Sequence, residues 1–97
     1  MSNGFILWAD DEIELLKGHV IFLEKKGYDV TTVSNGADAI DECRKRTFDL
    51  VMLDEMMPGL TGLETLQRVK EIQPQTPVVM VTRAKKRTLW NRPLVLK

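Results

Sequence analysis

The chain has one cysteine, few aromatic residues and no long apolar run. Cys43 stands alone among 97 residues, which excludes an internal disulfide and a metal cluster built on several thiolates. No run approaches the roughly 20 apolar residues that span a bilayer. Residues 1–4, MSNG, lack the charged and apolar regions of a secretory signal. We therefore expect a cytoplasmic protein in which Cys43 is a packed residue of a helix.

Length and charge predict one small domain. A chain of 97 residues that is 43% hydrophobic can bury one core and has no room for a second. The formal net charge is zero, yet residues 83–97 hold six basic residues and no acidic one, which leaves 8 basic against 14 acidic residues before them. A basic block can mark nucleic-acid binding. Apolar residues interrupt this one, so we expect no direct contact with nucleic acid.

Hydrophobic periodicity predicts that strands and helices alternate. Apolar or alternating runs indicate strands at residues 5–9, 28–33, 48–53 and 78–81, and helical spacing indicates helices at 12–26, 37–45 and 62–72. Strands separated by such helices form parallel sheets with right-handed crossovers, because a tight turn cannot join parallel strands. The sequence therefore predicts an α/β fold in which the carboxyl ends of the strands share one edge.

Acidic residues follow two of these strands. Asp10 and Asp11 come directly after residues 5–9, and Asp54 ends the apolar run that begins at Phe48. Open α/β sheets bind ligands at this edge. Two unit charges about 4 Å apart repel by roughly 4 kcal/mol at an effective dielectric near 20, so three acids here indicate a compensating cation. Mg²⁺ is the natural candidate, because it prefers oxygen ligands.

The layout resembles the response-regulator receiver domain, the CheY-like fold. The resemblance covers residues 4–82 and rests on motifs in family order: Asp10, Asp11, Asp54, Pro58, Gly59, Gly62 and Thr82. Each motif alone is also typical of an ordinary turn or helix cap, and their conjunction favours the receiver. The resemblance implies a three-layer, flavodoxin-like doubly wound parallel sheet with strand order 2-1-3-4 and a fifth strand beside the fourth.

The resemblance also implies a role for each site residue. Asp54 would accept a phosphoryl group, and Thr82 would donate its hydroxyl to that group. Asp11, Asp54 and the carbonyl of Met56 would bind Mg²⁺ directly, and Asp10 would bind it through water. A sensor histidine kinase would be the donor, and an effector or output domain would receive the conformational signal. The domain would catalyse at most its own phosphorylation and dephosphorylation, the latter slowly, because the apolar Met56 side chain cannot orient water.

Residues 83–97 do not fit the family pattern. After Thr82 a receiver needs a helix, a fifth strand ending in lysine and a last helix, and fifteen residues cannot encode all three. In one interpretation a shortened crossover lets residues 93–97 imitate the fifth strand, and Lys97 supplies the phosphate-binding cation. In the other interpretation the tail results from a frameshift. When residues 83–97 are back-translated with permitted codons and one adenine is restored, the codons read KSEEENIMEQAIGSK, which looks like the helix that a receiver needs here. We then expect an incomplete receiver at residues 1–82 and an atypical basic tail at 83–97.

Loss of the fifth strand would leave the edge of the fourth uncovered. Uncovered strands pair with other chains, so we expect a homodimer or domain swap through the C-terminal region. Residues 6–12, ILWADDE, look like the opening of PorX-type regulators.

Two alternatives to a phosphorylatable receiver remain at this point. One is a receiver-like interaction scaffold that is not phosphorylated. The other is a fragment of an aspartate-based phosphatase of the haloacid dehalogenase type, which needs a second acid where this chain has Met56.

Overall fold

The computed structural model describes residues 2–81 and the backbone of residues 94–96. Its elements are β1 (Gly4–Ala9), the 3-10 helix η1 (Ile13–Leu16), α1 (Lys17–Lys25), β2 (Tyr28–Val33), α2 (Gly36–Lys45), β3 (Leu50–Asp54), α3 (Gly62–Ile72), β4 (Val78–Val81) and β5 (Leu94–Leu96). The predicted alternation of strands and helices is confirmed, and β2, α3 and β4 have the predicted bounds. Within the described part of the chain, no helix is long and apolar enough to cross a membrane.

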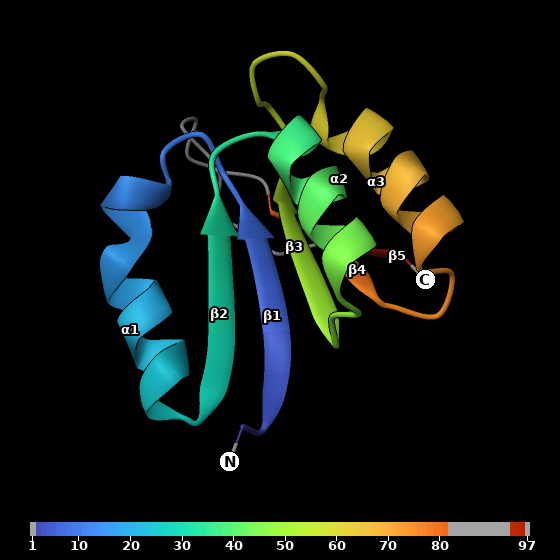
Figure 1. Cartoon of the computed structure of the whole chain (residues 1–97). Helices are drawn as coiled ribbons and strands as arrows, with labels where there is room; N and C mark the ends of the chain where they lie inside the picture. The colour runs from blue at the N-terminus through green and yellow to red at the C-terminus, as the bar shows by residue number, and fades with distance from the viewer. Residues whose placement is uncertain (1, 82–93, 97) are drawn as a thin grey trace.

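The strands form one sheet in the order β2-β1-β3-β4-β5. The first four are parallel, which confirms the doubly wound arrangement with strand order 2-1-3-4. Figure 1 shows the arrowheads of β1, β2 and β3 pointing to the same edge. Side chains that follow these strands are thereby brought to one end of the molecule.

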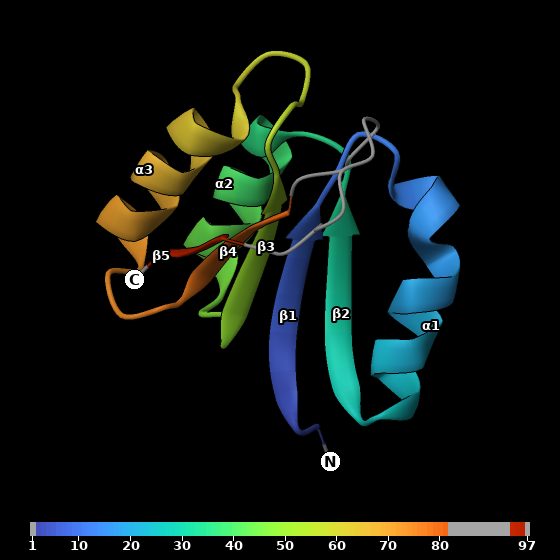
Figure 2. The same cartoon turned by 180° about the vertical axis from the view of Figure 1, so that it is seen from behind.

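The two faces of the sheet carry different helices, with α1 on one and α2 and α3 on the other (Figures 1 and 2). Residues of β1 alternate between these layers. Leu7 and Ala9 belong to the main buried cluster, whereas Trp8 packs edge-on against His19 of α1, with ring centroids 6.4 Å apart. Because both faces of β1 are covered, its sequence is an unbroken apolar run.

The helix predicted at residues 12–26 begins as a 3-10 turn, and α1 starts only at Lys17. Its first cap, Glu12, makes no side-chain capping bond. Instead the backbone N–H of Leu15 donates to the Glu12 carbonyl, and that of Ile13 donates to the Asp10 carbonyl. These i to i+3 bonds tighten the first turn, because an α-helix start without a cap leaves its N–H groups without intrahelical partners.

The strand predicted from Phe48 begins two residues later, at Leu50. The cause is Gln73, whose side chain is buried. Its Oε1 accepts from the Phe48 N–H at 3.0 Å, and its Nε2 donates to the carbonyls of Cys43 and Arg46 at 2.8 and 2.7 Å. The Phe48 N–H is thus bonded to a side chain rather than to the sheet. Gln73 joins the end of α2 and the start of β3 to the end of α3.

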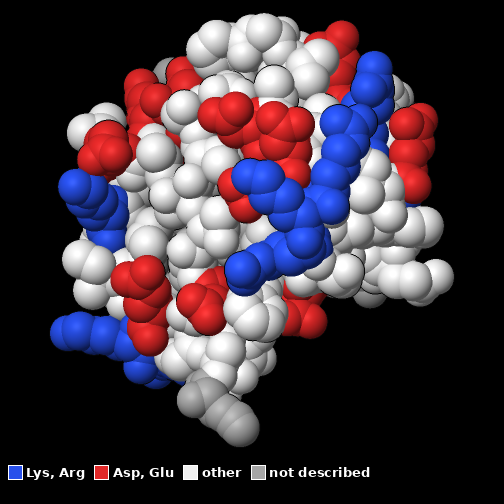
Figure 3. All heavy atoms as spheres, in the orientation of Figure 1, with Lys and Arg blue, Asp and Glu red and all other residues white. Residues whose placement is uncertain are grey.

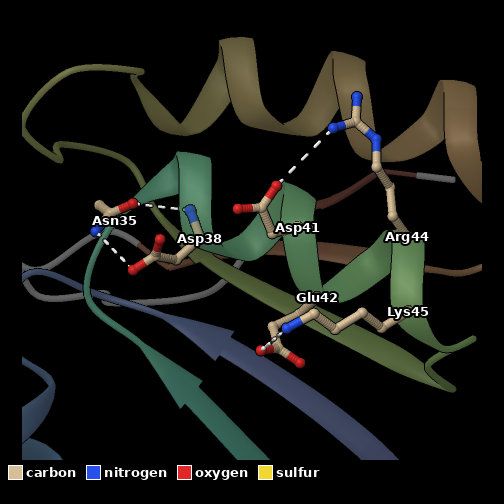
Figure 4. A network of polar contacts seen from close by, with 6 residues as sticks. All are labelled: Asn35, Asp38, Asp41, Glu42, Arg44 and Lys45. Atoms are coloured by element: carbon tan, nitrogen blue, oxygen red, sulfur yellow. Dashed lines mark hydrogen bonds and ion pairs between the residues drawn. The ribbon is translucent and has the colours of Figure 1, made fainter.

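Helix α2 begins one residue earlier than predicted, at Gly36. Asn35 caps it, with Oδ1 accepting from the Asp38 N–H at 2.8 Å (Figure 4). Asp38 lies in the first turn, and Arg44 and Lys45 lie in the last. Both placements favour the helix, since its N-terminus carries partial positive charge and its C-terminus partial negative charge.

Two exposed ion pairs extend this pattern along α2. Asp41 pairs with Arg44 at 3.9 Å, and Glu42 pairs with Lys45 at 3.7 Å (Figure 4). Figure 3 shows acidic and basic atoms side by side over this face of the molecule. Exposed pairs of this kind contribute little to stability, so this surface is a solvated face of the domain.

The fifth place in the sheet is filled by β5, which is antiparallel to β4. Val78 pairs with Leu96 and Met80 with Leu94. A shortened crossover would have produced a parallel strand, so the observed direction contradicts the crossover. Parallel neighbours need a crossover of a dozen or more residues, whereas antiparallel neighbours need only a chain reversal. The expectation that the edge of β4 is uncovered is also wrong over residues 78–80.

Candidate functional site

Asp54 is carried to the sheet edge by β3, a largely buried strand. Val51 and Leu53 of β3 are fully buried, and Asp54 itself is 3% exposed. Asp54 pairs with Val81 of β4, and the next N–H, that of Glu55, donates to the Val81 carbonyl at 3.3 Å. Backbone pairing therefore fixes the position of Asp54 up to the last residue of the strand.

Asp10 is fixed in a similar way at the end of β1. Its N–H donates to the Val33 carbonyl at 3.1 Å, which extends the pairing with β2 by one residue. Its Oδ1 accepts from the Glu12 N–H at 2.8 Å. Asp10 is fully buried, and the next residue, Asp11, is exposed. Asp10 thus provides a buried carboxylate, and Asp11 provides an exposed one.

The structure brings Asp10, Asp11 and Asp54 together. One carboxylate oxygen from each residue can be chosen so that all three lie within 4.8 Å of one another. Negative charges repel more strongly at a partly buried site than in water, because the effective dielectric is lower. A divalent cation would offset this repulsion, and hard oxygen ligands are those that Mg²⁺ prefers. The donor set of this cluster therefore fits Mg²⁺.

The other predicted site residues are Met56, Thr82 and Lys97. Met56 lies in the loop after β3, with its side chain 73% exposed, so its backbone carbonyl is the group that a metal role would require. Thr82 and Lys97 lie outside the described residues. Their assigned roles therefore stay predictions.

The loop between β3 and α3 is closed by backbone and side-chain bonds. Gly59 has φ +82°, a conformation that favours glycine, and the chain bends at residues 58–60. Thr61 and Glu64 form a capping box: Thr61 Oγ1 accepts from the Glu64 N–H at 3.1 Å, and Glu64 Oε1 accepts from the Thr61 N–H at 2.9 Å. The pattern T-x-x-E before an apolar helix was a sequence signal for this box.

Sequence reasoning missed the packing of Gly62. This residue begins α3, is buried, and donates its N–H to the Glu55 carbonyl at 3.1 Å. The start of α3 is thereby held against the residue that follows Asp54. The glycine was visible in the sequence, but nothing there indicated how closely it approaches the strand.

The chain is similar to known proteins in sequence and in fold. A family model described as response regulator receiver domain matches residues 6–95. A curated relative, the uncharacterized transcriptional regulatory protein YkoG of Bacillus subtilis (strain 168), is 40% identical over 82 residues, which cover 84% of this chain and 36% of YkoG. The chain spans about a third of the length of most of the first curated relatives it matches.

Solved structures show the same fold. The chemotaxis response regulator CheY4 of Vibrio cholerae has a TM-score of 0.77 and 30% sequence identity, with 89% of this chain and 72% of that chain covered. The response regulator protein TrrA of Thermotoga maritima, in complex with Mg²⁺-BeF, has a TM-score of 0.77 and 29% identity, with 88% and 72% covered.

Proposed function

The chain belongs to the response regulator receiver domain family, and we propose from that membership that Asp54 accepts a phosphoryl group from a sensor histidine kinase. The fold class and the two-component signalling function come with the family. The observation that supports Asp54 is its place at the end of a buried strand, beside the carboxylates of Asp10 and Asp11. A phosphoryl acceptor and a metal site belong together, because a carboxylate attacks phosphorus only when charge is offset.

The proposed step is an in-line transfer of the phosphoryl group. A carboxylate oxygen of Asp54 attacks phosphorus, and a new oxygen–phosphorus bond forms. The bond from phosphorus to the donor imidazole nitrogen breaks, and its electron pair stays on that nitrogen, which is left as a neutral or protonated histidine. The product is an aspartyl phosphate. The burial of Asp54 supports this role, since a buried acceptor restricts the access of bulk water to the acyl phosphate.

Mg²⁺ is the proposed cofactor. Asp11, Asp54 and the carbonyl of Met56 would hold it directly, and Asp10 would hold it through water. When bound, Mg²⁺ would offset the charge of the carboxylates and of the phosphoryl oxygens. The cluster of three acids supports this assignment, because without a cation it places like charges side by side at the sheet edge.

The proposed output is a change at the surface near the end of β4. Thr82, which follows β4, would donate its hydroxyl to a phosphoryl oxygen, and Lys97 would supply a cation to it. The signal would pass to an effector or to an output domain, since the chain covers only a third of most of its first curated relatives. We assign no direct nucleic-acid contact to residues 1–97, and we place the domain in the cytoplasm, where kinase donors hold their phosphoryl groups.

Two finer assignments concern the chain as a whole. Residues 1–82 would be the receiver, and 83–97 an atypical basic tail. The composition of the tail, with six basic residues and no acidic one, supports this division. The DNA sequence tests the frameshift. Codons for residues 83–97 that cannot be read as KSEEENIMEQAIGSK after one adenine is restored rule it out. The ILWADDE opening supports a PorX-type regulator, which would carry a phosphatase-like output domain.

We also assign a homodimer through the C-terminal region. Its support is β5, which is the last strand in the order of the sheet and has only three residues. A strand at a sheet edge offers N–H and C=O groups to a second chain. Light scattering tests this assignment: a dimer is expected at high protein concentration, and a strict monomer would contradict it.

The test of phosphorylation uses a small acyl phosphate in place of the kinase. The protein is incubated with acetyl phosphate and Mg²⁺ and weighed intact, beside Asp54→Asn. The wild type should gain one phosphoryl group, and Asp54→Asn should gain none. An unmodified wild type would contradict the proposal and would favour the alternative of an interaction scaffold. Equal gain by both proteins would also contradict it.

A further inference from the structure

Gly62 lies against the backbone of the proposed phosphoryl acceptor. A Cβ atom placed on Gly62 would overlap the Asp54 carbonyl oxygen and would lie 3.0 Å from Glu55 Cα and 2.7 Å from Met80 Cε. Two of these neighbours are backbone atoms, which cannot turn away as a side chain can. The third, Met80, has a flexible chain end that can move. An added methyl group at Gly62 would therefore push on the end of β3.

Gly62 is also hydrogen-bonded to the residue that follows Asp54. The Gly62 N–H donates to the Glu55 carbonyl at 3.1 Å, and Thr61 caps the same helix start through the box with Glu64. The first turn of α3 is thus capped and hydrogen-bonded to the residue next to Asp54. Movement of the helix start would be passed to Asp54 and to the loop that holds Met56.

We propose that Gly62 is a positioning residue for the divalent cation site formed by Asp10, Asp11 and Asp54. The inference rests on the proposed function. Mg²⁺ demands near-ideal octahedral geometry with bonds of about 2.0–2.1 Å, so a backbone shift at Asp54 would misplace a ligand. Glycine is needed because any side chain would occupy the space that the Asp54 carbonyl fills.

Gly36 provides a matched control. It is the first residue of α2, as Gly62 is of α3, and it is also buried. A Cβ atom on Gly36 would overlap Thr65 Oγ1 and lie 3.1 Å from Leu60 Cβ. These neighbours are side-chain atoms between α2 and α3. Gly36→Ala therefore causes comparable crowding without a direct contact with the backbone of Asp54.

The experiment titrates Mg²⁺ into the wild type, Gly62→Ala and Gly36→Ala and follows backbone amide signals by NMR. Unfolding by urea is measured on the same samples. Both variants should lose stability, but only Gly62→Ala should weaken Mg²⁺ binding, by about tenfold or more, whereas Gly36→Ala should stay within about twofold of the wild type. Equal Mg²⁺ affinity in the two variants would overturn the positioning role.

Two further measurements keep the test decisive if Gly62→Ala folds poorly. In Gly62→Ala/Met80→Leu the Met80 Cε contact is removed at nearly constant core volume, so the part of the lost stability that this contact causes should recover, while Mg²⁺ affinity stays low because the overlap with the Asp54 carbonyl remains. Recovery of both would overturn the proposal. In the wild type alone, Mg²⁺ should shift the Gly62 amide signal together with those of Asp54 and Glu55. A Gly62 signal that does not move while Asp54 responds would also overturn it.

The wild-type titration separates this inference from the proposed function. If the wild type binds no Mg²⁺, the cation site itself fails, and the role of Gly62 fails with it. If the wild type binds Mg²⁺ and Gly62→Ala binds it equally well, only the positioning role fails.

Discussion

Asp10 and Asp54 end neighbouring parallel strands, and their buried carboxyl groups approach within 4.8 Å. Pairing of Ala9 with Leu53 in the sheet register sets this proximity, because the acids are the next residue on each strand. Like charges held this close at a partly buried site repel more strongly than they would in water. The sheet register therefore holds two carboxylate groups close enough for one divalent cation to bind both.

The first prediction concerns the charge of Asp10. Asp10→Asn keeps an Oδ1 acceptor for the Glu12 N–H, a bond of 2.8 Å in the wild type, but removes one negative charge. We expect Mg²⁺ affinity to fall about tenfold, equivalent to ~1.4 kcal/mol. Without metal, the free energy of unfolding should stay the same or rise. Urea unfolding with and without Mg²⁺ measures both.

The control for this variant is Asp41→Asn, since Asp41 is exposed on α2. Asp41→Asn should leave the response to Mg²⁺ unchanged. A clear loss of metal-free stability in Asp10→Asn would contradict the view that Asp10 and Asp54 repel.

The second prediction concerns the lifetime of the aspartyl phosphate. Met56 follows Asp54 by two residues and is 73% exposed, and its apolar side chain cannot hold a water molecule. Asn at this position could orient one by a hydrogen bond worth about 0.5–1.5 kcal/mol, so Met56→Asn should speed dephosphorylation by roughly two- to tenfold. Loss of the phosphorylated mass over time measures this rate. Met56→Leu, which remains apolar, should match the wild type, and an equal rate in Met56→Asn would contradict the idea.

The third prediction concerns the buried amide that joins α2, β3 and α3. Gln73→Ala would leave the Phe48 N–H and the carbonyls of Cys43 and Arg46 without their side-chain partner. Buried polar groups that lose a partner cost about 1–3 kcal/mol, so the free energy of unfolding should fall by at least this amount. Gln67→Ala, an exposed position on α3, should change it by less than about 0.5 kcal/mol. Similar effects of the two variants in urea unfolding would contradict the role of Gln73 in joining α2, β3 and α3.

The fourth prediction concerns Cys43. Burial, with a smaller effect of Glu42, raises the pKa of this thiol to about 11, and the thiolate is the reactive form. An aromatic disulfide reagent at pH 8 should therefore react slowly with the native protein and rapidly in denaturant. Because the folded pKa lies above the unfolded value, this group favours the folded state below pH 9 and loses that contribution as the pH rises toward 11. Fast labelling of the native protein would show that Cys43 is accessible.

Much of the fold could be predicted because its central strands, β1 and β3, are largely buried. The unbroken apolar runs of β1 and β3 and the helical stripe of α3 each have one simple explanation. The observed bounds of β3 and of the first helix differ from the predicted bounds where side chains hydrogen-bond to the backbone. Gln73 removes Phe48 from β3, and Asp10 with Glu12 tightens the start of the first helix. Such contacts join residues that the pattern of one segment does not connect.

The site was predictable only in part. Asp10, Asp11 and Asp54 could be placed together from strand order, since parallel strands share an edge. The closeness of Gly62 to the Asp54 carbonyl depends on how α3 packs, which periodicity does not give. The antiparallel direction of β5 was not predicted, because residues 83–97 do not follow the family pattern from which the fifth strand was inferred.

The most direct test of the account locates the phosphoryl group. The protein is treated with acetyl phosphate and Mg²⁺, reduced with borohydride, digested and sequenced by mass spectrometry. Borohydride converts an aspartyl phosphate to homoserine, so the account predicts homoserine at position 54 and at no other aspartate, and none when Mg²⁺ is removed by chelation. Homoserine at Asp10 or Asp11, or a phosphoryl group retained on a serine, threonine or histidine with Asp54 intact, would contradict it.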